Sequence, residues 1–136
     1  MSATRILIGG QALRELGSDR YTNDTDYLVN DKSTKEAFIT SEKVDLLNAN
    51  GNKFFAEIFK IEEGKVIASP QSLLELKAYA MVQHCQNFNF KKADQAEYDI
   101  KFLVRNFGLT EIKIAQKYIS NGELFEVNKA IKSVKF

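Results

Sequence analysis

Two adjacent glycines, Gly9 and Gly10, follow a short β-branched run at residues 5–8. A run of this kind that ends in glycines is typical of a buried strand entering a turn. Apolar residues at helical spacing follow at residues 11–16, and Gly17 ends them, as expected for a short helix. The chain is therefore expected to begin as strand, glycine turn and helix, which limits the folds that the rest can complete.

The remaining pattern divides the chain into a strand-rich part and a helical part. Short apolar segments predict strands at residues 27–29, 37–40, 44–47 and 64–68. Residues 54–61 fit either a helix or a strand, and the spacing of their apolar residues favours a helix. Ser69 and Pro70 suit a helix start, and helices are expected at residues 71–85, 94–106, 110–121 and 122–136, of which 71–85 is the longest. The prediction is one α/β (α+β) domain, residues 1–136, with a short mixed sheet in residues 1–68 and helices packed beside it in residues 69–136.

Composition excludes several classes of protein. The chain has 136 residues, 44% of them hydrophobic and 27% charged, and a net charge of +1, as in ordinary globular domains. A single cysteine rules out an internal disulfide and a cysteine-based zinc site, and fits a cytoplasmic protein. No apolar run is long enough to span a membrane. The near-neutral charge gives no global case for nucleic-acid binding, so a DNA duplex is not an expected partner.

Two carboxylates, Asp24 and Asp26, stand two positions apart in residues 21–29, which are expected to be the polar entry into a strand whose apolar end is residues 27–29. Alternate residues of a strand point to the same face, which would place these side chains roughly 6 to 7 Å apart. Carboxylates this close repel each other unless a cation lies between them, and Mg²⁺ prefers such oxygen ligands. The alternative is a polar turn, in which Asp, Asn and Thr are common.

A third carboxylate, Asp45, lies between apolar residues in the strand expected at residues 44–47 and is expected to face away from the core. If that strand lies beside the strand of Asp26, three carboxylates converge. Such a cluster suits two metal ions about 3.5 to 4 Å apart, which activate an attacking oxygen and neutralise phosphates. Glu42 and Glu57 are rival candidates for the third acid.

The turn at Gly9 and Gly10 complements these carboxylates, because a backbone without side chains can approach a triphosphate closely. Amides at the start of the following helix then face the anionic oxygens. Other motifs do not fit, since the chain has neither a GxGxxG nor a GxxxxGK(S/T) sequence. An EF-hand is excluded because Tyr27 and Leu28 stand where it needs a ligand and a glycine.

The order of Gly9-Gly10, a gap of thirteen residues, Asp24-Thr25-Asp26 and then Asp45 resembles the signature of the nucleotidyltransferase superfamily that includes DNA polymerase beta. The variant here, GGxAL followed by RxTxDxD, is similar to that of small bacterial members. These are minimal nucleotidyltransferases, lincosamide-type antibiotic nucleotidyltransferases and AbiEii-type toxins. The resemblance covers residues 5–47 and extends loosely to residues 69–77 and 94–103. It implies that Asp24 and Asp26 bind the metals and that Asp45 helps to activate the acceptor hydroxyl.

In AbiEii-type proteins a helix lysine and a later aspartate complete the site, and Lys77 and Asp99 match those positions. The resemblance thus implies that Lys77 contacts phosphate. Helical periodicity also places Lys77 on an apolar face, where its charge needs an anion or must extend past the helix edge to water. Asp99 lies beside the apolar stripe of its helix and is a candidate partner of Lys77, Lys92 or Lys101.

Four other residues have open roles. Arg20 is a candidate phosphate contact or a partner of an acidic neighbour, and Thr22 is a candidate nucleotide contact or a cap. His84 is expected to be an inward-facing histidine rather than a ligand, and Cys85 an inert buried thiol.

The sequence therefore predicts a Mg²⁺-dependent nucleotidyltransferase that binds ATP or another nucleoside triphosphate. It is expected to move a nucleoside monophosphate from this nucleotide to an acceptor hydroxyl and to release pyrophosphate. The acceptor is expected to be a small molecule or a protein. Two alternatives stay open: a toxin of a toxin–antitoxin pair that modifies tRNA or another RNA and binds an antitoxin, and a non-catalytic nucleotide-binding protein of the same fold.

Overall fold

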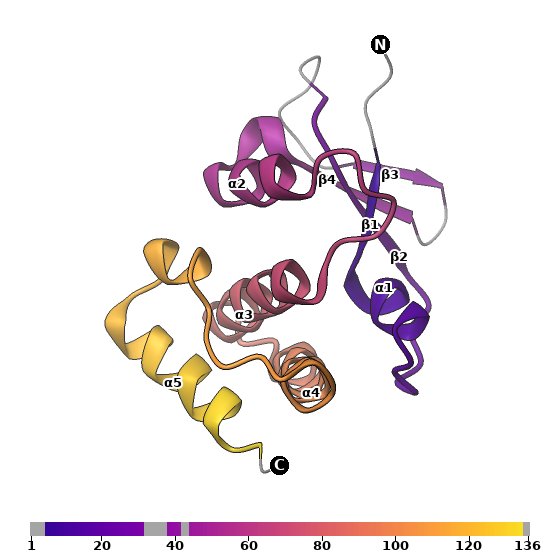
Figure 1. Cartoon of the computed structure of the whole chain (residues 1–136). Helices are drawn as coiled ribbons and strands as arrows, with labels where there is room; N and C mark the ends of the chain where they lie inside the picture. Colours follow the sequence, from indigo (N-terminus) through magenta and orange to yellow (C-terminus); the bar gives the residue numbers. More distant parts are fainter. Residues whose placement is uncertain (1–4, 32–37, 42–43, 135–136) are drawn as a thin grey trace. The chain divides into compact units, whose positions relative to one another are not determined.

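The computed structural model describes residues 5–31, 38–41 and 44–134 (Figure 1). The chain forms two compact units, residues 1–69 and residues 70–136, and each is described by itself. Every strand found in the described residues belongs to the first unit, while the second is helical. The expectation of an α/β protein with strands before helices is confirmed.

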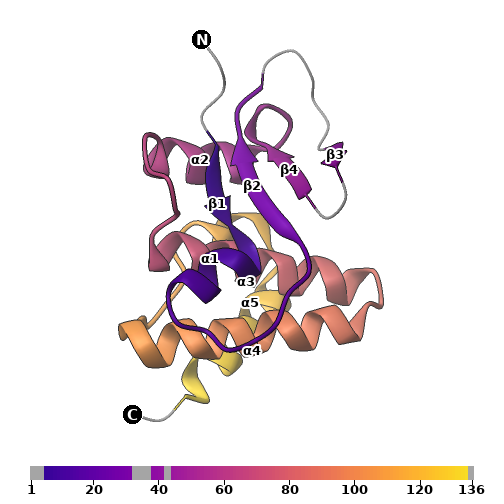
Figure 2. The ribbon, with the colours of Figure 1, turned by 90° about the vertical axis from the view of Figure 1, so that its right-hand side faces the viewer.

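Four strands form one mixed sheet in the order β1-β2-β4-β3. The strands are β1 (Ile6–Ile8), β2 (Thr25–Val29), β3 (Phe38–Ser41) and β4 (Val44–Asn48). Figure 2 shows β2 between β1, to which it is antiparallel, and β4, to which it is parallel. The first four predicted strands are thus confirmed, apart from residue 37, which lies outside the described residues. The fifth, at residues 64–68, is reduced to a single bridge between Leu7 and Ile67.

Both faces of the sheet contribute to the core of the first unit. Paired residues of neighbouring strands point to the same face, so Ile6, Ile8 and Leu28 share one face, where each is at most 2% exposed. Val29 and Leu46 are buried on the opposite face. The helices α1 (Gly9–Glu15) and α2 (Lys53–Glu62) both contact β2 and add apolar side chains to this core.

A buried carboxylate, Glu62, fixes the end of the first unit. It accepts hydrogen bonds from the backbone N–H of Ser69 and from the Lys65 ammonium. Burial alone would raise the pKa of Glu62, but the hydrogen bonds from Ser69 and Lys65 together hold this pKa below its ordinary value. The charged form of Glu62 therefore stabilises the segment that follows α2.

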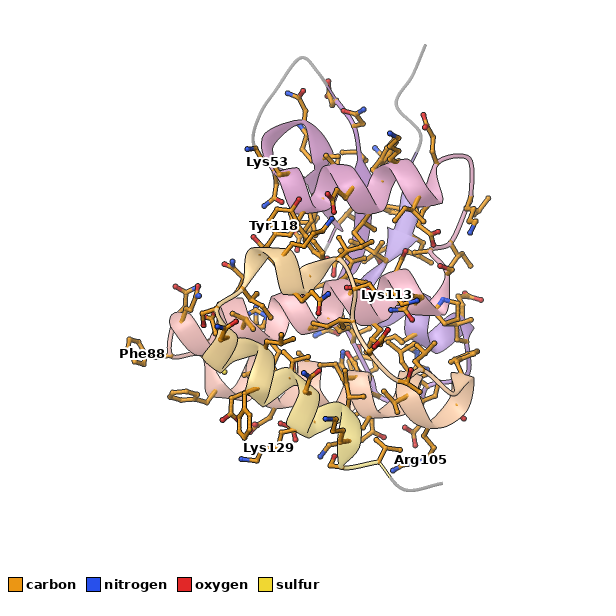
Figure 3. All side chains as sticks on the ribbon, turned by 60° about the vertical axis from the view of Figure 1, so that its left-hand side comes forward. Lys53, Phe88, Arg105, Lys113, Tyr118 and Lys129 are labelled. Carbon is orange, nitrogen blue, oxygen red and sulfur yellow. The ribbon has the colours of Figure 1, made fainter. Side chains whose placement is uncertain are left out.

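The second unit consists of α3 (Pro70–Gln86), α4 (Phe90–Phe107) and α5 (Asn121–Lys132). The prediction that the helix after Pro70 is the longest is wrong, because α4 has 18 residues and α3 has 17. α4 begins four residues before the predicted position. The side chain of Asn89 caps this helix, because it accepts a hydrogen bond from the backbone N–H of Lys92. Phe88, in the turn between α3 and α4, projects away from the helices (Figure 3).

The helix predicted at residues 110–121 is also wrong. Only residues Ala115–Tyr118 form a short 3-10 helix there. Three successive backbone N–H groups, of Lys113, Ile114 and Ala115, donate to the buried carboxylate of Glu75 at 2.7, 3.0 and 2.9 Å. A side chain of α3 therefore satisfies the amides that a helix would otherwise have paired with its own carbonyls.

No helix in the described part of the chain is long and apolar enough to cross a membrane.

Candidate functional site

Asp26 and Asp45 are direct partners in the parallel ladder between β2 and β4. Neighbouring strands lie about 4.8 Å apart and paired residues point to the same face, so the two half-buried carboxylates lie side by side. Asp24 is exposed and precedes β2 by one residue. All three carboxylates thus lie at the N-terminal ends of these strands, Asp24 and Asp26 at the start of β2 and Asp45 at the start of β4.

The orientation expected for Asp45 is wrong. Since Asp45 pairs with Asp26, and Asp26 pairs with Ile8, Asp45 shares a face with the buried side chains of Ile8 and Leu28. The reason is that both faces of this sheet are partly covered, so apolar neighbours in the sequence do not mark a single core side. Asp26 and Asp45 thus stand in the same row of the sheet as the buried Ile8, and Leu28 lies one row further along the same face.

Gly9 lies directly against the carboxylate of Asp26. Its φ angle is +72°, a conformation that favours glycine. A Cβ at Gly9 would lie 2.5 Å from the carboxylate oxygen Oδ2 of Asp26. Glycine is therefore required twice at this position, by backbone conformation and by the close approach of Asp26.

Gly10 has a corresponding contact with Thr22. A Cβ at Gly10 would lie 2.8 Å from the Thr22 methyl carbon. The side-chain amide of Gln11 also donates to the Thr22 carbonyl at 3.2 Å. The turn after β1 and the loop before β2 are thus packed against each other, which brings the glycines and the DxD pair to one end of the sheet.

The expected order of a glycine turn and then a helix from residue 11 is wrong, because α1 already begins at Gly9 and has only seven residues. Gly9 and Gly10 form its first turn, and its N-cap residue is Ile8. The apolar side chain of Ile8 offers no acceptor for the amides of the first turn, in contrast to Ser, Thr, Asn or Asp at this position. The sequence prediction that these amides face phosphate oxygens is compatible with this arrangement and stays a prediction.

Arg20 belongs to the same loop, and its side chain turns back to the backbone. Its guanidinium donates to the carbonyl of Tyr21 at 3.4 Å, and its own N–H donates to Ser18 Oγ at 3.3 Å. Its predicted contact with phosphate stays a prediction, as does the contact of Thr22 with a nucleotide. Among the rivals to Asp45, Glu57 lies on α2 and Glu42 lies outside the described residues.

The carboxylates of Asp24, Asp26 and Asp45 are the oxygen donors that Mg²⁺ prefers. However, within residues 5–31, 38–41 and 44–134 no group of three His, Cys, Asp or Glu side chains is placed to hold a metal ion. The predicted convergence of three carboxylates is therefore not assembled in this structure. The pair formed by Asp26 and Asp45 fits an ion that takes its other ligands from water and substrate phosphates, as Mg²⁺ commonly does.

In the second unit, Lys77 and Asp99 form an ion pair, with 2.9 Å between Nζ and Oδ2. The Lys77 side chain is 15% exposed and that of Asp99 is 1% exposed. Of the partners considered for Asp99, Lys77 is confirmed, whereas Lys101 pairs with Glu97. Asp99 belongs to the buried face of α4, so the expectation that it lies beside the apolar stripe is wrong. The ammonium of Lys77 offsets the cost of burying this carboxylate.

Lys77 is thus supplied with an anion by its own unit. A lysine on an apolar face needs such a partner, as its position in α3 predicted. The predicted contact between Lys77 and phosphate, and a role for Asp99 in the site, stay predictions.

Two neighbouring residues at the end of α3 differ in outcome. His84 is half-buried, and desolvation together with the charges of Lys92 and Lys77 lowers its pKa. Cys85 is exposed, so the expected burial of this thiol is wrong. Desolvation and the carboxylates of Asp94 and Glu126 raise the pKa of Cys85, which agrees with an unreactive thiol.

Two residues were missed by reasoning from the sequence. Glu75, which is 1% exposed, organises the segment after α4, and an acidic residue within the apolar run of residues 73–78 was the available signal. Tyr21, which is 73% exposed, stands beside Thr22 in the loop before the DxD pair. An aromatic residue in a polar loop was the signal there.

Comparison of this chain with protein-family models, with curated proteins and with solved structures gave no match.

Proposed function

We propose that this chain is a Mg²⁺-dependent nucleotidyltransferase that moves a nucleoside monophosphate from a nucleoside triphosphate to an acceptor hydroxyl. The observation that carries the proposal is the pairing of Asp26 with Asp45 on parallel strands, against the backbone of Gly9. The finer part of the fold prediction, a nucleotidyltransferase core completed by the C-terminal helices, belongs to the same proposal.

The residues of the first unit divide the work. The backbone at Gly9 and Gly10, which packs against Asp26 and Thr22, would lie beside the triphosphate. Asp26 and Asp45 would hold Mg²⁺, which when bound neutralises phosphate charge and favours the deprotonated acceptor.

The chemical step is an in-line displacement. The acceptor oxygen forms a bond to the α-phosphorus of the nucleoside triphosphate. The bond from that phosphorus to the oxygen bridging the β-phosphate breaks, and pyrophosphate leaves with the electron pair. The hydroxyl proton passes to the carboxylate of Asp45, which acts as a general base.

A non-catalytic nucleotide-binding protein is the second candidate. It is favoured by one observation: in the described part of the chain no three acidic, histidine or cysteine side chains are placed together as metal ligands. The two candidates share nucleotide binding and differ only in turnover.

Binding of an ATP analogue with a methylene group between the α- and β-phosphates tests what both candidates share. Calorimetry should show binding in Mg²⁺ that is lost in excess EDTA and in Asp26→Asn. Asp94→Asn, which alters an exposed carboxylate on α4, is the matched control and should bind as the wild type does. Equal binding with and without Mg²⁺, or none at all, would contradict the proposal.

A further inference from the structure

Tyr21 is an exposed aromatic residue at the candidate phosphate site. Its side chain is 73% exposed, although an aromatic ring of this size is usually at least half buried. The next residue, Thr22, packs against Gly10, and Asp24 follows two positions later. Because consecutive Cα atoms lie about 3.8 Å apart, the ring starts from a point next to the Gly9–Gly10 turn.

The loop that carries this ring is braced by hydrogen bonds. The carbonyls of Arg20, Tyr21 and Thr22 each accept a hydrogen bond from a side chain, at 3.2, 3.4 and 3.2 Å. The donors are the side chains of Arg14, Arg20 and Gln11. Three successive carbonyls held in this way leave the backbone at Tyr21 little freedom.

The ring itself is also held. The Tyr21 hydroxyl donates to Oδ1 of Asn23 at 2.5 Å. The polar end of the side chain is thus satisfied, while the apolar faces of the ring are left to solvent. A fixed ring with open faces loses little conformational entropy when a planar ligand stacks on it.

We propose that Tyr21 is the base-binding residue of this site and stacks on the nucleobase of the nucleoside triphosphate. This inference rests on the proposed function, because it needs the triphosphate at Gly9 and Gly10. Stacking uses the π-face that every base has, so all four nucleotides bind. Purines bind more tightly than pyrimidines because their larger rings cover more of the tyrosine.

The test compares two ligands in the presence of Mg²⁺: ATP, which has a base, and inorganic tripolyphosphate, which has none. Calorimetry should show that Tyr21→Ala weakens ATP binding by about fivefold or more, the usual effect of removing one stacking ring. Tripolyphosphate binding should be unchanged, and Tyr21→Phe should bind ATP nearly as the wild type does. Phe125→Ala removes a comparably exposed ring, 64% exposed, from α5 and should change neither affinity.

A second readout is the ratio of the ATP and UTP affinities, which should fall toward one in Tyr21→Ala. Equal losses of ATP and tripolyphosphate binding in Tyr21→Ala would overturn the inference, since the ring would then only support the loop. Unchanged ATP binding and an unchanged ratio would overturn it as well. If the wild-type protein binds neither ligand, the proposed function itself fails, and the inference fails with it before any variant is compared.

Discussion

The carboxylates of Asp26 and Asp45 occupy partner positions on two adjacent parallel strands. Like charges directly opposite each other in a sheet reduce stability, in general by a few tenths to about 1 kcal/mol. A protein bears such a cost where the charges serve a ligand. This relationship leads to the first prediction.

Asp45→Asn should raise the free energy of unfolding in metal-free buffer by about 0.5 kcal/mol, because it removes one of two facing charges. Mg²⁺ should raise the melting temperature of the wild-type protein and have less effect on the variant. Thermal unfolding with EDTA and with Mg²⁺ measures both effects, and Asp94→Asn is the control. A loss of stability in Asp45→Asn without metal would show that Asp26 and Asp45 do not repel each other.

Gly9→Ala should destabilise the protein by about 1 to 3 kcal/mol, because a Cβ strains the positive φ and meets the Asp26 carboxylate. Gly122→Ala is the control, since a Cβ there meets no atom within 4 Å. Denaturant unfolding measures both variants. In the background of Asp26→Ala the cost of Gly9→Ala should fall, because the clashing oxygen is gone. An unchanged cost would mean that Asp26 does not require the glycine.

Lys77→Met should cost about 3 to 5 kcal/mol, because it leaves the Asp99 carboxylate buried without its cation. Combining it with Asp99→Leu should recover much of this loss, since neither charge is then left alone. The exposed pair of Lys101 and Glu97, also 2.9 Å apart, is the matched control, and Lys101→Met should cost at most about 1 kcal/mol. Urea unfolding of the wild type, Lys77→Met, Asp99→Leu and the double variant gives the coupling energy between Lys77 and Asp99. Simple additivity would contradict the ion pair.

Glu75→Gln should destabilise the protein by about 3 kcal/mol, because it replaces a carboxylate oxygen that accepts hydrogen bonds from backbone N–H groups at residues 113–115. Hydrogen exchange at Ile114 and Ala115 should speed up far more than exchange in the core of α4. Glu126→Gln, a change at an exposed position on α5, should leave this exchange as it is. Unaltered protection at these two amides would show that Glu75 does not hold the segment.

Local patterns were sufficient to predict most strands and helices of this chain. Short apolar runs bounded by polar turns predicted β1, β2, β3 and β4, because neighbouring residues decide such patterns. The register between β2 and β4 is a long-range property. The sequence therefore predicts that Asp26 and Asp45 lie close together only if these two strands are neighbours. The sequence also could not show that Asp45 shares a face with Ile8, since that depends on what covers each face.

The errors in the helical part have the same origin. Thr110 has the chemistry of a cap, but the buried Glu75 on another helix takes the amides that follow it. Helical periodicity alone predicts Asp99 beside an apolar stripe, because its partner Lys77 lies 22 positions away in the sequence. In both cases a buried charge and its distant partners decide the structure, and helical periodicity carries no information about such pairs.

The transfer of label from ATP tests the central claim most directly. The protein is incubated with Mg²⁺ and cell extract, and ATP is labelled on the α-phosphate in one sample and on the γ-phosphate in another. We predict that, relative to extract without the protein, the added protein increases the α-label in an RNA, protein or small-molecule fraction and adds no γ-label to any of these fractions. Asp26→Asn and Asp45→Asn should abolish this gain, while Asp94→Asn should not. A gain of γ-label in an acceptor above that of extract alone, or no gain of α-label from any of the four nucleoside triphosphates, would contradict the proposal.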